Sequence, residues 1–186
     1  MKRVLLVLVC AASFTALNAQ VKFGANAGLN LSNIVGDDAG DLKMKPGFHV
    51  GVHALIPVST QFGVQPELVF STQGAKDEDD VKYNLNYLNL PVLATLTTAS
   101  GFFAQAGPQI GFLMSAKAKA DGESVDIKEG FKSTDFSLAL GVGFAGQSGF
   151  GAKARFNLGL SSLDEAGDAK VKNSVIQVGV IYNFGG

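Results

Sequence analysis

The chain has few residues that support redox or metal chemistry. Its 186 residues include one cysteine, two histidines and no tryptophan. The cysteine, Cys10, lies in the apolar segment near the N-terminus. If that segment is removed on export, the remaining protein has no disulfide and no thiol chemistry. We therefore expect its stability to come from packing and backbone hydrogen bonds.

An excess of charge is also missing. The formal net charge is -1 and the pI is about 6.1. Proteins that bind nucleic acid use a basic surface field to attract phosphates, and this composition provides none. We expect no nucleic-acid partner, and no motif indicates a cofactor.

Residues 1–19 have the features of a secretory signal peptide. Lys2 and Arg3 form a positively charged start, and a short apolar core follows and ends near Ala19. The unbroken apolar run is too short to span a membrane comfortably as a helix. We predict that residues 1–19 are cleaved and that residues 20–186 form one domain, whose fold the pattern below indicates.

After this segment, long apolar runs are absent. No stretch approaches the roughly 20 residues that a transmembrane helix needs, although 47% of the residues are hydrophobic. The chain instead has 23 glycines and 14 phenylalanines, and its apolar residues recur with a period of two. Glycine costs about 1 kcal/mol in a helix interior, whereas a two-residue period is typical of strands. The pattern predicts an all-β protein.

Eight alternating stretches predict eight strands, each long enough to cross a membrane at a tilt. They lie near residues 22–32, 47–58, 61–73, 83–97, 101–115, 132–145, 150–161 and 173–184. Long polar connections lie near 33–46, 74–82, 116–131 and 162–172, and short ones near 59–60, 98–100 and 146–149. Long and short connections alternate, as outer loops and periplasmic turns do in outer-membrane barrels. The sequence therefore predicts an eight-stranded antiparallel up-and-down transmembrane β-barrel.

The two faces of the predicted strands favour a membrane barrel over a soluble one. One face is bulky and uncharged, as in Phe48, Val50 and Val52, and the other is small and polar, as in Gly24 and Asn26. A soluble barrel would carry many charged residues on its exterior, and a lipocalin would turn its apolar face inward. We predict that the apolar face contacts lipid. The sheet must then close, because hydrocarbon offers no partner to an unpaired backbone group.

Aromatic residues of the apolar face are expected to form two interfacial girdles. The periplasmic girdle would contain Phe23, Phe62, Phe102, Phe144, Phe150 and Phe184, and the outer girdle Phe48, Phe70, Phe112 and Phe136. Pro66, Pro91 and Pro108 each remove a ladder donor within a strand, so we expect bulges there. The apolar residues of the stretch 83–97 follow both phases, so its register is not determined by the pattern.

Several short segments resemble a family of outer-membrane proteins. They are Gly47-Phe48-His49-Val50-Gly51, Gln65-Pro66-Glu67-Leu68, Ser71-Thr72-Gln73-Gly74 and Leu85-Asn86-Tyr87-Leu88-Asn89-Leu90-Pro91. Their order and spacing are similar to those of the outer-membrane β-barrel domain family of PorT-like and "porin family" proteins. The resemblance implies an integral protein of the bacterial outer membrane, in contact with lipid and lipopolysaccharide. Because PorT is associated with protein secretion, it also leaves open a secretion role with envelope protein partners.

The last stretch carries a second resemblance. Gln177, Gly179, Tyr182 and Phe184 resemble the last-strand signal that the barrel assembly machinery reads. The resemblance implies that this machinery is a partner and that the protein becomes a multi-pass protein of the outer membrane.

Six polar residues of the inward phase form the candidate site. They are His49, His53, Glu67, Asp135, Lys153 and Arg155. The charged residues are two of each sign, and buried charges are tolerated only when paired, so we expect a structural cluster of ion pairs. Four residues along a strand separate the histidines by about 13 Å, too far to share one metal ion. We expect them to make lumen hydrogen bonds, and we expect no metal site.

The sequence indicates no reaction. Ser71, Ser115 and Ser161 could act beside an inward carboxylate in an outer-membrane lipid hydrolase or protease, but no spacing singles one out. Eight strands enclose only enough space for side chains, so we do not expect an open diffusion pore. We predict a non-enzymatic barrel with a structural or surface-interaction role. A PorT-like secretion component and a hydrolase or protease are the alternatives.

Overall fold

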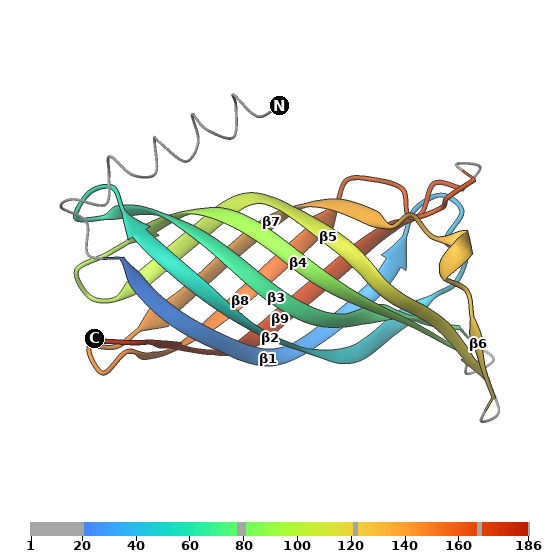
Figure 1. Cartoon of the computed structure of the whole chain (residues 1–186), viewed down its shortest axis with the longest axis horizontal. Coiled ribbons are helices and arrows are strands. Elements are labelled where there is room, and N and C mark those ends of the chain that lie inside the picture. Colours follow the sequence, from blue (N-terminus) through green and yellow to red (C-terminus); the bar gives the residue numbers. More distant parts are fainter. Residues whose placement is uncertain (1–20, 78–80, 121–122, 167–168, 186) are drawn as a thin grey trace.

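A computed structural model of the chain describes residues 21–77, 81–120, 123–166 and 169–185. The predicted signal peptide lies outside the described residues. The described chain is a barrel whose strands run obliquely around a long axis (Figure 1). The start of β1 and the end of β9 lie at the same end of this barrel.

The barrel is one antiparallel sheet that closes on itself. Its strands are β1 (Lys22–Val35), β2 (Lys43–Pro57), β3 (Phe62–Lys76), β4 (Lys82–Thr97), β5 (Phe102–Ala120), β7 (Thr134–Ala145), β8 (Phe150–Gly159) and β9 (Lys172–Asn183). Consecutive barrel strands pair with each other, and β1 pairs with β9 to close the ring. Closure satisfies the backbone groups of every strand without water. The predicted eight-stranded antiparallel barrel is confirmed.

Two further elements belong to the connection between β5 and β7. The short strand β6 (Glu123–Asp126) pairs with the far end of β5, and the 3-10 helix η1 (Lys128–Gly130) follows it. Among the described residues, no helix is long and apolar enough to cross a membrane.

We call the end of the barrel opposite the start of β1 and the end of β9 the outer end (Figure 1). The strands run farther toward it than the hydrophobic pattern indicates. Ten residue steps separate Phe102 from Phe112 in β5. At about 3.3 Å per residue and a tilt of about 40°, these steps cover a height of roughly 25 Å, the usual apolar band of such barrels. The remainder of β5, up to Ala120, therefore extends beyond a band of that height. Its last residues include the exposed Lys117 and Lys119, so the bulky apolar phase ends before them.

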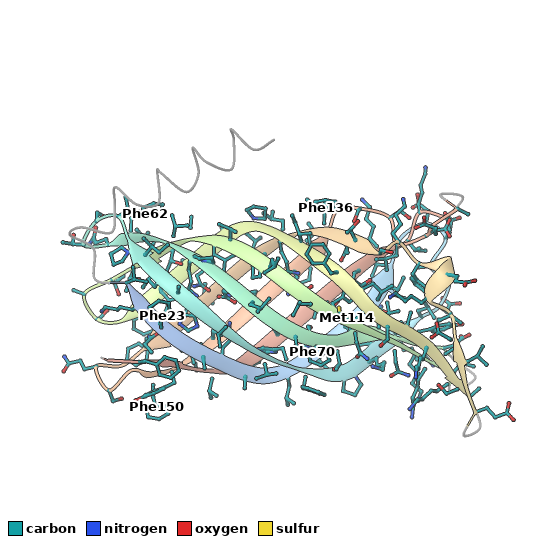
Figure 2. All side chains as sticks on the ribbon, viewed as in Figure 1. Phe23, Phe62, Phe70, Met114, Phe136 and Phe150 are labelled. Carbon is teal, nitrogen blue, oxygen red and sulfur yellow. The ribbon has the colours of Figure 1, made fainter. Side chains whose placement is uncertain are left out.

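The predicted orientation of the two faces is confirmed. Bulky residues such as Phe23, Val50 and Phe102 are half exposed or more on the outside, whereas Asn30 and Gln105 are buried. Figure 2 shows side chains covering the exterior of the ribbon.

The aromatic residues lie at two levels of the exterior. Phe23, Phe62 and Phe150 lie near the end where the chain terminates, and Phe70 and Phe136 lie beyond the middle of the barrel (Figure 2). Neighbouring rings also contact each other, with ring centroids 5.1 Å apart for Phe102 and Phe144 and 6.1 Å apart for Phe48 and Phe70. This placement fits the two expected girdles, and the outer one lies well short of the end of the barrel.

The expected bulges at the three prolines are wrong. The register between β3 and β4 is the same before and after the positions next to Pro66, and β5 pairs with β7 regularly through Pro108. The β4–β5 register is likewise the same on either side of the gap that follows Pro91. A missing N–H donor removes one hydrogen bond but does not require an extra residue in the strand. The register shifts lie elsewhere, between Met44 and His49 in β2 and beside Asn86 in β4.

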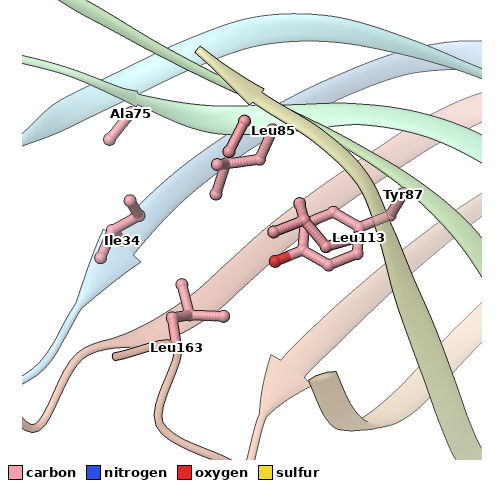
Figure 3. Packing of buried hydrophobic residues seen from close by; sticks show 7 residues of the cluster. Ile34, Ala75, Leu85, Tyr87, Leu113 and Leu163 are labelled. Atoms are coloured by element: carbon pink, nitrogen blue, oxygen red, sulfur yellow. The ribbon is translucent and has the colours of Figure 1, made fainter. Parts of the chain in front are cut away.

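The outer part of the lumen is apolar, which the sequence pattern did not indicate. Seven buried side chains from different parts of the chain pack there (Figure 3). They are Ile34, Ala75, Leu85, Tyr87, Leu113, Ala116 and Leu163, which we call the outer lumen cluster. This cluster explains the two phases of β4, because Leu85 and Tyr87 point inward while Leu90 and Val92 face outward.

Candidate functional site in the barrel lumen

Glu67 is the centre of the polar lumen. Its carboxylate accepts two hydrogen bonds from the Arg155 guanidinium, at 2.8 and 2.7 Å, and a third at 2.7 Å from the Gln65 amide. The Lys153 ammonium lies 3.6 Å from the same carboxylate. Arg155 donates a further hydrogen bond of 3.1 Å to Gln105. These side chains form a buried network, and its bidentate pair has the geometry in which arginine and carboxylate interact most strongly.

The ion pair between Glu67 and Arg155 crosses the full width of the barrel. Glu67 lies on β3 and Arg155 on β8. In one direction around the ring, β3 and β8 are separated by three strands, β2, β1 and β9. In the other direction they are also separated by three strands, β4, β5 and β7. The two strands are therefore opposite one another. Their side chains meet near the axis and occupy the lumen at that level.

The two histidines belong to separate hydrogen-bond groups. His49 Nδ1 lies 2.8 Å from Asn30 Oδ1, and His53 Nε2 lies 2.9 Å from Asn183 Oδ1. Asn30 also donates to Ser71 Oγ at 2.9 Å. Within the described ranges, no group of three histidine, cysteine, aspartate or glutamate side chains is placed to hold a metal ion.

Glycines on neighbouring strands make room for the large inward side chains. Gly28 pairs with His49 across β1 and β2, and Gly24 pairs with His53. A Cβ atom on Gly28 would lie 2.8 Å from the His49 ring and 2.2 Å from the Val178 carbonyl oxygen. Large inward side chains therefore fill the lumen, and each of the two histidines faces a glycine, which has no side chain, on the neighbouring strand.

Asp135 lies apart from the Glu67 network. It is six residues from Gly141 on β7, and Gly141 is the cross-strand neighbour of Arg155. This spacing is about 20 Å along the strand. The Asp135 carboxylate instead accepts a hydrogen bond of 2.9 Å from Ser161 Oγ. The structure thus brings together three of the four charged residues singled out from the sequence and places the fourth nearer the outer end.

The sequence analysis did not single out the amides that complete the network. Gln65 and Gln105 contact the ion pair directly, while Asn30 links His49 to Ser71. Their inward phase was visible in the sequence, but many other amides share it. Only the positions across the lumen distinguish those that reach the charges.

The four residues that we expect to form the last-strand signal lie on β9 or directly after it. Gln177 points inward and donates to Asn30 Oδ1 at 3.1 Å, and Gly179 is the cross-strand neighbour of Gly28. On the outside, the Tyr182 ring centroid is 4.4 Å from that of Phe150 and 5.5 Å from that of Phe184. The aromatic pair is thus part of the girdle at the end where the chain terminates.

Comparison with solved structures finds similar barrels. Neisserial surface protein A shares 13% identity with a TM-score of 0.58, over 87% of this chain and 97% of that one. Ail of Yersinia pestis, in complex with the heparin analogue sucrose octasulfate, shares 19% identity with a TM-score of 0.52, over 88% of this chain and 99% of that one. At these identities the likeness shows the fold alone.

Comparisons of the sequence itself give one positive result. A search of curated proteins finds no match to this chain. Residues 12–165, however, match the model of the family described as "Outer membrane protein beta-barrel domain". Because this match covers most of the chain and the fold agrees with it, the protein belongs to the outer-membrane β-barrel domain family and so to the bacterial outer membrane.

Proposed function

We propose that the protein is a non-enzymatic outer-membrane barrel with a closed lumen, which acts through the surface it presents outside the membrane. The observation that carries this proposal is the filling of the lumen at two levels. The Glu67–Arg155 pair crosses the barrel at one level, and the outer lumen cluster packs at the other. Eight strands enclose a space that side chains alone can fill.

The two levels close the lumen in different ways. Glu67 and Arg155 are both almost fully buried, so their charged groups are stabilised by each other and not by bulk water. In the outer lumen cluster, Leu85, Ala75 and Ala116 have no exposed surface. An ion would therefore have to displace packed side chains to cross the barrel.

Conductance across a planar lipid bilayer tests the closed lumen. We expect the purified protein, inserted at a verified density, to give no large, stable currents, because side chains of the described residues pack across the lumen at two levels. A sixteen-stranded porin inserted in the same way is the positive control, since barrels of that size leave an open channel. Large, stable currents from this protein would contradict the proposal.

The outer surface is the part available to partners. The strands extend beyond the outer girdle, and the connecting residues 36–42, 160–166 and 169–171 lie there. Outer-membrane lipid and lipopolysaccharide are the expected surroundings of the apolar exterior, and envelope proteins are candidate partners of the projecting end. Ail has been observed with a heparin analogue, so sulfated polysaccharide is a reasonable probe to include.

Extraction in mild detergent followed by affinity purification tests for such partners. We expect the barrel to be recovered without a stoichiometric set of secretion proteins. Recovery of a defined envelope assembly would instead favour the PorT-like alternative.

One observation favours an enzyme as the second candidate. Asp135 and Ser161 meet in the outer half of the barrel, which brings a carboxylate and a hydroxyl within hydrogen-bond distance. Ser161 Oγ, however, also accepts a hydrogen bond from the Phe136 backbone, which holds it in a structural position. The histidines bond to Asn30 and Asn183, so neither stands beside this pair as a base.

Hydrolysis assays test the enzyme alternative. We expect the purified protein to release no product from phospholipid, lipopolysaccharide or unstructured peptide above the level of a Ser161→Ala variant. Turnover that is present in the natural sequence and lost in this variant would overturn the non-enzymatic assignment.

A further inference from the structure

A cavity of about 330 Å³ lies in the lumen between the Glu67 network and the end of the barrel where the chain terminates. We call it the periplasmic vestibule. The turns near Gly101 and Gly149 form its rim. Its volume is at the lower end of the range of small-molecule sites, about 300–1,000 Å³. The polar residues that line it include His53, Gln65, Thr95, Gln105, Lys153 and Asn183.

The charge of the vestibule is positive. Lys153 lies in its wall and Lys22 at its rim, and no carboxylate lines it among the residues the structure describes. Glu67, behind the wall, already accepts two hydrogen bonds from Arg155, while Lys153 approaches it only to 3.6 Å. The network therefore holds two cations and one carboxylate. A buried charge without a full partner is costly, so the site favours an added anion.

A second observation indicates an occupant. His53 is buried, its Nε2 contacts Asn183, and its Nδ1 has no hydrogen-bond partner among the described residues. This nitrogen offers a polar contact whose direction depends on the tautomer. The Gln65 amide nitrogen already donates a hydrogen bond to Glu67, and the Gln105 amide nitrogen donates one to Thr95. Lys153 and His53 are thus two buried groups of the wall that have capacity for a ligand.

The wall also has an apolar part. Leu55, Phe103 and Ile181 line the vestibule together with these polar groups. We propose that the periplasmic vestibule binds a small organic anion, with its anionic group at Lys153 and an apolar portion against Phe103. This site is separate from the outer surface to which the proposed function refers.

Benzoate is the probe for this site, benzamide is its uncharged counterpart, and inorganic phosphate lacks the apolar portion. Methyl NMR of the purified protein in detergent, at constant ionic strength, would report binding through Leu55 and Ile181. We expect saturable shifts with benzoate. Benzamide should bind at least about tenfold more weakly, because it lacks the charge of one charge-assisted hydrogen bond. Phosphate is expected to bind more weakly than benzoate. The methyls of Leu163, in the outer lumen cluster, should not shift.

Two variants and one control link the binding to the surplus charge. Lys153→Met should weaken benzoate binding at least about tenfold, while Lys172→Met, an exposed change at the outer end of β9, should leave it unchanged. Gln105→Glu places a carboxylate where Arg155 already donates a hydrogen bond, so this variant should fold and lose benzoate even if Lys153→Met does not fold. Equal binding of benzamide, unsaturable shifts or unchanged binding in Gln105→Glu would overturn the proposal.

Discussion

At the scale of single residues, the lumen depends on glycines that face large side chains. Gly28 and Gly24 make room for the rings of His49 and His53. Lys153 is similarly placed, between Gly143 and Gly179 on the adjacent strands. The high glycine content of the chain is therefore partly a packing requirement of a narrow barrel.

The replacement Gly28→Ala tests this requirement. Its Cβ would meet the Val178 carbonyl oxygen at 2.2 Å, so the backbone or the His49 ring must shift. We expect the free energy of unfolding to fall by about 1–3 kcal/mol, the usual effect of overpacking. Urea unfolding in lipid vesicles would measure it. Gly130→Ala is the matched control, because nothing lies within 4 Å of its Cβ position, and an equal loss in both variants would contradict the packing argument.

At the scale of elements, strand β9 has two faces with different roles. Gln177 and Gly179 face the lumen, where Gln177 joins the hydrogen bonds around Asn30. Tyr182 and Phe184 face outward, and Tyr182 packs against Phe150 of the neighbouring strand β8. We propose that these four residues form the signal that the barrel assembly machinery reads, and that the outward pair is an essential part of it.

A pair of substitutions separates assembly from stability. Tyr182→Ala with Phe184→Ala should lower the yield of inserted barrel severalfold in membranes that contain the assembly machinery, while refolding into pure lipid changes much less. Phe150→Ala is the control, because it removes the same ring contact with Tyr182 from β8. Equal loss of insertion in the control and the β9 variant would mean that the pair acts through packing alone.

Strands were the part of the structure that the sequence predicted best. Alternation identified all eight barrel strands, because one face of each contacts lipid and the other contacts the lumen. It could not locate their outer ends or the bulge beside Asn86, where the register shifts. Beyond the lipid, both faces of a strand can be polar, so the pattern no longer marks the strand.

At the scale of the whole molecule, one buried network joins opposite walls of the barrel. Glu67 comes from β3, while Arg155 and Lys153 come from β8. The single carboxylate balances one of two cations. The stability of the barrel should therefore depend on the sign of the charge that is removed.

We expect three substitutions to lower the free energy of unfolding by different amounts. Glu67→Gln leaves two buried cations and should lower the free energy of unfolding by about 3–5 kcal/mol. Arg155→Met leaves Glu67 paired with Lys153 and should cost less, about 1–3 kcal/mol. Lys153→Met removes the surplus cation and should cost least. Urea unfolding in lipid vesicles would establish the order, and a larger loss for Lys153→Met than for Glu67→Gln would contradict it.

The sequence by itself determined the number of strands, their antiparallel order and the face that contacts lipid. These properties follow from the two-residue period and the lengths of the connections, which are local. Only the tertiary structure decided that Glu67 meets Arg155, that Asp135 lies with Ser161, and that the outer lumen is apolar. The reason is physical: contacts across the lumen depend on how the closed sheet staggers its strands, and no single strand carries that information.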